Sequence, residues 1–296
     1  MPPLPPLRLS CAAALVAAAL LLAACGRGGD GRGRDDTSLA AAGDIAGCFW
    51  RGDEATARLL DGMGGVVAPL GDVVYPHGTD AEFRRCYHPT WGRHLDRTRP
   101  AVGNHEYKTK DAGGYFRYFG ARAGQAGKGW YSYQHDGWHV VVLNSEEPLE
   151  PASEQVRWLD ADLKAHPSRC TLAYFHHPRF SSGRHGGKGR VADAFRVMYD
   201  HGVDVVLSGH DHHYERFAPQ DPDGREDRER GIRQFVVGTG GAPSYRLRNK
   251  PVRNSEALSN NVRGVLRLVF HTDGYEWEFV PIPGRRFEDR GRGDCH

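Results

Sequence analysis

The sequence carries almost no net charge, because its 39 Lys and Arg residues are offset by 37 Asp and Glu residues and the formal net charge is only +2. A protein that binds nucleic acid by bulk charge needs a large basic excess, so that class is excluded. The chain contains no Gly-x-Ser-x-Gly pattern, which excludes the common serine hydrolases. It has no Cys-x-x-Cys pair, which disfavours a structural zinc site. His105-Glu106 lacks the histidine at position 109 that a His-Glu-x-x-His zinc protease requires.

No apolar run is long enough to cross a membrane. The longest, residues 11–24, has 14 residues, whereas a transmembrane helix needs about 20 and a secretory signal core has roughly 7–15. We therefore expect residues 1–24 to be a signal peptide. The run ends in Leu22-Ala23-Ala24-Cys25, which resembles the lipobox of bacterial lipoproteins. The resemblance implies that Cys25 is lipidated and anchors an exported, extracytoplasmic protein to the membrane surface; the alternative is cleavage after Ala24 and secretion.

The segment after the signal is polar. Residues 26–37 contain no apolar residue. We therefore expect residues 25–37 to be a lipidated cysteine followed by a flexible tether. The folded domain is then expected to span residues 38–296. The cysteines of that domain are Cys48, Cys86, Cys170 and Cys295. An even number of cysteines in an oxidising compartment predicts two disulfides, with three possible pairings.

Several short apolar runs in the domain are each followed by polar residues. These runs are Leu39–Ala42, Val66–Leu70, Pro100–Val102, Leu172–Phe175 and Val203–Ser208. Short continuous apolar runs between helix-like segments are typical of buried, mostly parallel strands. Ligands bind at the carboxyl ends of such strands. In four of the five, a glycine stands directly before the first polar group, where it allows the backbone to approach a bound ion or phosphate closely.

The remaining pattern predicts helices and antiparallel hairpins. The expected helices are Asp53–Met63, Ser153–His166 and Lys188–His201. Later strands are expected at Ile232–Val237, Gly264–His271 and Tyr275–Pro281. The last two form a hairpin, and a second hairpin flanks Asp136-Gly137. The predicted fold class is α/β, with two packed mixed β-sheets flanked by helices in an α/β/β/α sandwich.

The polar residues at the strand ends predict the chemistry. They are Asp44, Asp72, Asn104, His176, His210 and His212, with Tyr75 nearby. This mixture of carboxylate, amide, imidazole and phenol suits a borderline or hard transition metal. Seven donors are too many for one tetrahedral ion, but they suit two ions that share a carboxylate. Two such ions can clamp the attacking and leaving oxygens of a phosphoryl displacement.

The motifs that contain these residues occur in a recognisable order. They are Gly43-Asp44, Gly71-Asp72-x-x-Tyr75, Gly103-Asn104-His105-Glu106, Phe175-His176-His177-Pro178 and Gly209-His210-x-His212-x-Tyr214-Glu215-Arg216. Together they resemble the calcineurin-like metallophosphoesterase superfamily, and most of all its purple acid phosphatase branch. One departure is Ala46, which stands where many members of the superfamily have a coordinating histidine.

The resemblance implies a role for each residue. The first metal would be held by Asp44, Asp72, Tyr75 and His212. The second would be held by Asp72, Asn104, His176 and His210, with Asp72 shared between them. His105 and His185 would be the catalytic histidines, which bind phosphate or donate a proton. His177 has no ligand role and is interpreted as a supporting residue; the histidines outside the motifs, including His139 and His166, are interpreted as surface or packing residues.

The implied function is hydrolysis of phosphate esters by in-line attack of a metal-bound hydroxide. Phosphomonoesters are the first expectation for the substrate. The alternatives are a phosphodiesterase of the same superfamily and a non-catalytic metal-binding lipoprotein. Tyr75 as a ligand favours Fe(III) at the first site, since a phenolate needs a highly charged cation; Zn, Mn or Fe is expected at the second. Nothing in the pattern indicates an oligomeric state.

The strand order also distinguishes between the disulfide pairings. Cys48 follows the first strand end and Cys86 lies shortly after the second motif. Because neighbouring strand ends bring their following segments together, we predict the pair Cys48–Cys86. The second pair is then Cys170–Cys295.

Overall fold

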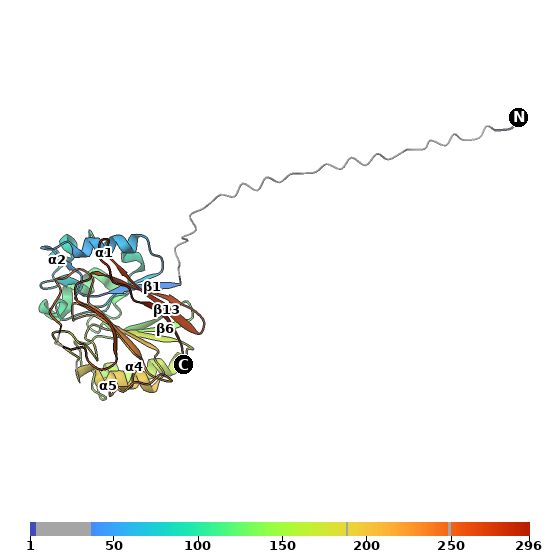
Figure 1. Cartoon of the computed structure of the whole chain (residues 1–296). Helices are drawn as coiled ribbons and strands as arrows, with labels where there is room; N and C mark the ends of the chain where they lie inside the picture. The colour runs from blue at the N-terminus through green and yellow to red at the C-terminus, as the bar shows by residue number, and fades with distance from the viewer. Residues whose placement is uncertain (4–36, 188, 248–249) are drawn as a thin grey trace. The chain divides into compact units, whose positions relative to one another are not determined.

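The computed structural model describes residues 1–3, 37–187, 189–247 and 250–296. The predicted signal core, the lipobox cysteine Cys25 and the tether up to residue 36 therefore lie outside the described residues. From residue 37 onward, two β-sheets are stacked between helices: α1 and α2 lie on one side, and α4 and α5 on the other (Figure 1). This arrangement confirms the predicted α/β sandwich with mixed sheets.

The first sheet has five strands in the order β14-β13-β12-β1-β3. Its strand β1 (Ser38–Ala42) pairs in parallel with the edge strand β3 (Val66–Pro69) and antiparallel with the central strand β12 (Gly264–Phe270). Strands β12 and β13 (Gly274–Pro281) form the predicted hairpin, and β14 (Arg290–Asp294) lies at the edge. A separate two-stranded sheet joins β2 (Ala46–Gly47) to β4 (Val74–Tyr75).

The second sheet has seven strands in the order β11-β9-β10-β8-β7-β6-β5. The strands are β5 (Tyr131–His135), β6 (Trp138–Val142), β7 (Thr171–Tyr174), β8 (Val205–Ser208), β9 (Tyr214–Phe217), β10 (Arg233–Val237) and β11 (Ser255–Ser259). Strands β6, β7, β8 and β10 run in parallel, while β5, β9 and β11 are antiparallel to their neighbours. The predicted hairpin around Asp136-Gly137 is the β5–β6 pair.

The helices are short and connect or cover the strands. They are α1 (Gly52–Asp61), α2 (Asp80–Glu82), α3 (Gly113–Phe119), α4 (Glu154–Ala165) and α5 (Ala192–Asp200). A π-helical segment η1 spans Phe83–Tyr87. The 3₁₀ segments are η2 (Trp91–Arg97), η3 (Glu106–Lys108), η4 (Lys110–Ala112), η5 (Gly120–Ala123) and η6 (Gly189–Val191). Ser153 caps α4 as predicted, since its hydroxyl accepts a hydrogen bond from the Val156 N–H at 3.2 Å.

Alternate residues of the second sheet serve two separate cores. Val140 and Val142 belong to the core that the two sheets share, whereas Val141 and Leu143 pack with the core beneath α4 and α5. This alternation is the period of two that a β-strand imposes on its side chains. It holds α4 against β6 and fixes the helix relative to the strand ends.

Two sequence predictions of elements need correction. The run Pro100–Val102 is not a strand but makes only the isolated bridge Leu70↔Ala101 beside β3. Pro100 has no N–H to donate, and its carbonyl accepts from the Tyr115 and Tyr131 hydroxyls, both at 2.9 Å, so no ladder continues through it. The helix expected from Lys188 starts as the 3₁₀ turn η6 and becomes α-helical at Ala192.

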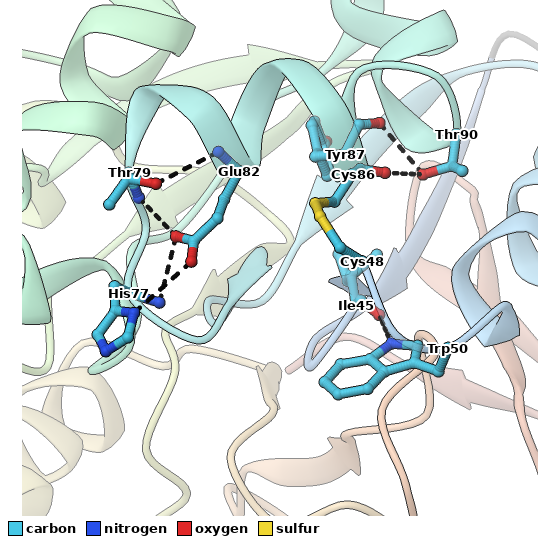
Figure 2. The surroundings of a disulfide bond; sticks show 9 residues. All are labelled: Ile45, Cys48, Trp50, His77, Thr79, Glu82, Cys86, Tyr87 and Thr90. Carbon is cyan, nitrogen blue, oxygen red and sulfur yellow. Dashed lines mark hydrogen bonds and ion pairs between the residues drawn. A yellow bond between two sulfur atoms is a disulfide. The ribbon is translucent and has the colours of Figure 1, made fainter.

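Both predicted disulfides are present. Cys48–Cys86 joins the loop after β2 to η1, with Cα atoms 5.0 Å apart (Figure 2). Cys170–Cys295 ties the start of β7 to the end of β14, across the two sheets, with Cα atoms 5.4 Å apart. Two disulfides fit an oxidising, extracytoplasmic compartment. Among the described residues, no helix combines the length and apolar character needed to cross a bilayer.

Candidate metal centre

Three of the strand-end residues have an unusual backbone. Asp44, Asp72 and His210 follow β1, β3 and β8, and their φ angles are 59°, 46° and 70°. The left-handed region costs a residue with a side chain about 1–3 kcal/mol and persists only where the surroundings enforce it. At these positions the turn bends the chain sharply, so each side chain points into the space beyond the strand ends.

Glycines make that convergence possible. A Cβ on Gly103 would lie 2.2 Å from the backbone nitrogen of Asp72, and a Cβ on Gly71, whose φ is +80°, would lie 2.6 Å from Nδ1 of His176. Real Cβ atoms do not approach other atoms so closely. Glycine at these two positions is therefore a steric requirement for the loops at the strand ends to pack together, and the expected approach of an ion or phosphate to this backbone stays a prediction.

Three donor atoms converge around the hydroxyl oxygen of Tyr75. This oxygen lies 2.8 Å from Oδ1 of Asp44, 3.0 Å from Oδ2 of Asp72 and 3.2 Å from Nε2 of His212. The other ring nitrogen of His212, Nδ1, lies 2.6 Å from the Pro243 carbonyl oxygen. Such a contact orients the imidazole and turns Nε2 toward the cluster. The residues predicted for the first metal thus lie together.

The second group of donors is centred on His176. Its Nε2 atom lies 3.4 Å from Oδ2 of Asp72, 3.2 Å from Oδ1 of Asn104 and 3.2 Å from Nδ1 of His210. The Leu70 carbonyl lies 2.8 Å from Nδ1 of the same ring. Oδ2 of Asp72 therefore lies between the two groups, 3.0 Å from the Tyr75 hydroxyl and 3.4 Å from His176.

The two buried carboxylates of the cluster require positive charge beside them. Burial raises the pKa of Asp72, but attraction to the His176 imidazolium outweighs it and holds this pKa well below its usual range. Burial lowers the pKa of His176, but Asp72 raises it to about 10. The pair of Asp44 and His212 behaves in the same way: burial opposes both charges, yet their attraction lowers the pKa of Asp44 and raises that of His212.

These observations test whether the residues fit metal ions. A cation can supply the positive charge that the two imidazolium protons otherwise provide. Burial and the nearby His176 lower the pKa of His210 to about 2, so the His210 ring is neutral and can offer a nitrogen lone pair to a cation. Nε2 of His210 is buried and has no hydrogen-bond partner among the described residues. The donor set of oxygens and neutral imidazoles fits borderline or hard cations.

The two predicted catalytic histidines lie beside different donor groups. Nε2 of His105 is 3.8 Å from Oδ2 of Asp72, and its ring centre is 4.1 Å from that of Tyr75. The ring of His185, an exposed residue, lies 4.6 Å from that of His210. Both therefore flank the cluster without entering it.

His177 lies behind the cluster. It is buried, its Nδ1 atom lies 3.0 Å from Oγ of Ser145 and 3.2 Å from Oε1 of Glu146, and its ring is 4.2 Å from that of His210. It supports His210 by packing, in keeping with its interpretation as a supporting residue.

The sequence reasoning missed the role of Glu106. Its carboxylate is buried; Oε1 accepts hydrogen bonds from the N–H groups of Val73 and Val74 at 2.9 and 3.1 Å, and Oε2 from that of Gly103 at 2.9 Å. It thereby joins the loop after Asp72 to the loop that carries Asn104. Burial raises the pKa of Glu106 to about 8, whereas the backbone donors favour its ionised form. Its position in the third motif was the only signal available.

Tyr245 was missed as well. Its ring stacks on His212, with centres 3.9 Å apart and planes at 17°, and the Arg184 guanidinium lies 5.7 Å from its centre. It lies in a loop after β10 with no motif around it, so no sequence signal pointed to it.

The chain is similar in sequence to proteins of a known family. The sequence profile described as "Calcineurin-like phosphoesterase" matches residues 37–214. The chain is 31% identical over 205 residues to purple acid phosphatase 21 of Arabidopsis thaliana, covering 61% of this chain and 45% of that protein. It is 30% identical over 185 residues to a phosphoenolpyruvate phosphatase of Allium cepa, covering 53% and 37%. The chain thus spans less than half the length of these curated relatives.

Solved structures share the fold. The purple acid phosphatase PPD1 of yellow lupin superimposes with a TM-score of 0.70 at 15% identity, over 86% of this chain and 53% of that one. GAP50, the anchor in the inner membrane complex of Plasmodium, superimposes with a TM-score of 0.65 at 14% identity, over 88% and 89%. At such low identity these similarities concern the fold alone.

Proposed function

Because this chain belongs to the calcineurin-like phosphoesterase family, we propose that it is a metal-dependent phosphatase that hydrolyses phosphate esters. The observation that carries the proposal is the position of Asp72. One of its carboxylate oxygens lies within 3.4 Å of both donor groups. A shared carboxylate is what a site for two neighbouring ions needs.

The residues would divide between two ions. The first ion, proposed as Fe(III), would be held by Asp44, Asp72, Tyr75 and His212. The second, proposed as Zn, Mn or Fe, would be held by Asp72, Asn104, His176 and His210. When bound, such ions lower the pKa of a water molecule and neutralise the oxygens of a phosphate.

His105 and His185 would act on the substrate. His105 flanks the group around Tyr75, and His185 flanks the group around His210. A phosphate seated on the cluster would contact imidazoles from both flanks. One of them would protonate the leaving alkoxide, a step that contributes about 10²–10⁴-fold to the rate.

Phosphomonoesters are the proposed substrates, with phosphodiesters as the alternative. We further propose that the protein acts outside the cytoplasm, since its two disulfides suit an oxidising compartment. Anchoring to a membrane surface through a lipid on Cys25 would keep the enzyme at the cell envelope.

The test is a panel of phosphomonoesters and phosphodiesters on metal-loaded full-length protein. Asp72→Asn should abolish hydrolysis and reduce the metal content. Asp136→Asn is the matched control, because Asp136 has a similar φ of 48° but is exposed in the β5–β6 hairpin. Near-normal turnover by a folded Asp72→Asn protein that retains both ions would contradict the assignment. Metal binding without hydrolysis of any ester would favour the non-catalytic alternative.

A further inference from the structure

A second cluster of potential metal ligands lies at the opposite end of the parallel strands. His139 is near the start of β6, where it pairs in register with Thr171 at the start of β7. The metal centre lies beyond the other end of these strands, after Phe175. Asp162 lies in α4 and His166 caps the end of this helix, one helical turn further along, so both side chains lie on the side of the helix that meets His139.

The three side chains bring their donor atoms close together. Nε2 of His139 lies 2.7 Å from Oδ2 of Asp162, and Nδ1 of His166 lies 3.2 Å from Oδ1 of the same carboxylate. One donor atom from each residue lies within 4.8 Å of the other two. The two imidazole rings stack with centres 5.0 Å apart and planes at 23°.

The burial of the cluster leaves one open side. His139 is 1% exposed and Asp162 is 8% exposed, whereas the His166 side chain is 49% exposed. An ion can therefore reach the buried donors past His166. Solvent on that side can also supply a water as a further ligand.

Outer contacts hold the buried donors in place. Nε2 of Gln134 lies 2.9 Å from Nδ1 of His139 and donates to it, and the Ser132 hydroxyl donates to Oδ1 of Asp162 at 2.7 Å. Metal-binding imidazoles commonly donate from the second ring nitrogen to an acceptor, and the Gln134 side chain provides one when its amide turns over and presents its oxygen. Burial raises the pKa of Asp162, but hydrogen bonds from His139 and Ser132 outweigh it and lower the pKa, so the carboxylate is ionised at neutral pH.

We propose that His139, Asp162 and His166 form a third metal site, separate from the proposed dinuclear centre, for a single borderline divalent cation such as Zn²⁺. Two imidazoles and one carboxylate, with water as a fourth ligand, suit tetrahedral zinc. On binding, the His139 proton that faces Asp162 moves from Nε2 to Nδ1, and the Gln134 amide turns over so that its oxygen, in place of Nε2, accepts a hydrogen bond from Nδ1. Nδ1 of His166 gives up its 2.9 Å contact with the Asp162 carbonyl oxygen, and its proton moves to Nε2. The ion then ties α4 to β6.

The neighbouring pair of His201 and Asp160 provides a matched control. Nε2 of His201 lies 2.9 Å from Oδ1 of Asp160, which is also on α4. Within the described part of the chain, no third His, Cys, Asp or Glu completes a metal-binding group there. A simple His–Asp surface contact can thus be distinguished from a three-donor site.

The experiment compares Zn²⁺ binding by the full-length wild type, His166→Ala and His201→Ala, using equilibrium dialysis and elemental analysis. Wild type and His201→Ala should bind one more Zn²⁺ per chain than His166→Ala. The melting temperatures of wild type and His201→Ala should also rise more with added Zn²⁺ than the melting temperature of His166→Ala. His166 is half-exposed, so its replacement should leave the chain folded, and circular dichroism checks this. All three proteins keep the residues around Asp72, so the difference is independent of whether the proposed phosphatase function is correct.

Two results would overturn the third site. Equal Zn²⁺ stoichiometry in wild type and folded His166→Ala would show that these residues hold no ion. Equal losses in His166→Ala and His201→Ala would indicate adventitious binding by surface histidines.

Discussion

The hydroxyl of Tyr75 lies 2.8 Å from Oδ1 of Asp44, although the two residues are 31 positions apart. This contact places a phenol beside the donors of the first proposed metal, near a loop whose Ala46 has no side chain that can coordinate. Under the proposed function, the Tyr75 side chain would complete a donor group that the loop after β1 cannot complete.

Tyr75→Phe should remove a visible absorption band from the iron-loaded protein. Burial, together with the charges of Asp44 and Asp72, raises the pKa of Tyr75 well above its ordinary value. The phenolate therefore forms only beside a highly charged cation, and charge transfer from phenolate to Fe(III) gives colour. Absorption spectra of wild type and variant at equal iron content check this. A band that survives in Tyr75→Phe would show that Tyr75 is not a ligand.

Glu106→Gln should destabilise the protein and weaken its metal binding. An amide –NH₂ group in place of one oxygen would face a backbone N–H of Val73, Val74 or Gly103 and leave it unpaired, at a cost of about 1–3 kcal/mol. Chemical denaturation and metal analysis measure the two effects. Glu82→Gln is the control, because Glu82 also accepts a backbone N–H, from Thr79 at 2.8 Å, but at the partly exposed start of α2. Equal losses in both variants would contradict a special role for Glu106.

Arg184→Ala should reduce kcat/KM about tenfold, or ~1.4 kcal/mol, for a substrate with a second negative group such as phosphoenolpyruvate. The exposed Arg184 guanidinium lies over Tyr245, which stacks on His212. Under the proposed function, this position lets Arg184 attract a second anionic group of a substrate whose phosphate is seated on the cluster. Phenyl phosphate should be affected much less. Arg190→Ala is the control, since Arg190 lies in the following turn but faces Glu146 at 3.6 Å. A uniform loss on both substrates would refute this selectivity.

Replacing both Cys170 and Cys295 by Ser should lower the free energy of unfolding by about 2–4 kcal/mol without changing metal content. The crosslink joins residues 125 positions apart, against 38 for Cys48–Cys86. In the chain-entropy description, the longer loop stabilises by about 1 kcal/mol more. Chemical denaturation of the Cys170/Cys295 and the Cys48/Cys86 double-serine variants measures which disulfide contributes more to the free energy of unfolding. Loss of metal from the Cys170/Cys295 variant would show coupling across the sheet that we do not expect.

The disulfides and the strand ends show what local sequence can predict. Four of the five apolar runs are strands that end in a distinctive polar residue, so these strands could be predicted without the structure, whereas their order in the sheets was not predicted. The pairing Cys48–Cys86 followed from the expectation that the first two strand ends are neighbours. The strand predicted at Pro100–Val102 was wrong, because the loss of pairing depends on the Tyr115 and Tyr131 hydroxyls, which come from other elements.

By itself, the sequence determined the fold class, the five motifs and the residue types available to hold metal ions, because these depend on local periodicity and on the chemistry of single side chains. Only the tertiary structure decided that Glu106 joins two loops, that Tyr245 covers His212, and that His139 contacts the carboxylate of Asp162. Those contacts join residues that are distant in the chain or lie on separate elements. No local pattern encodes them, since they arise only when the sheets and helices pack together.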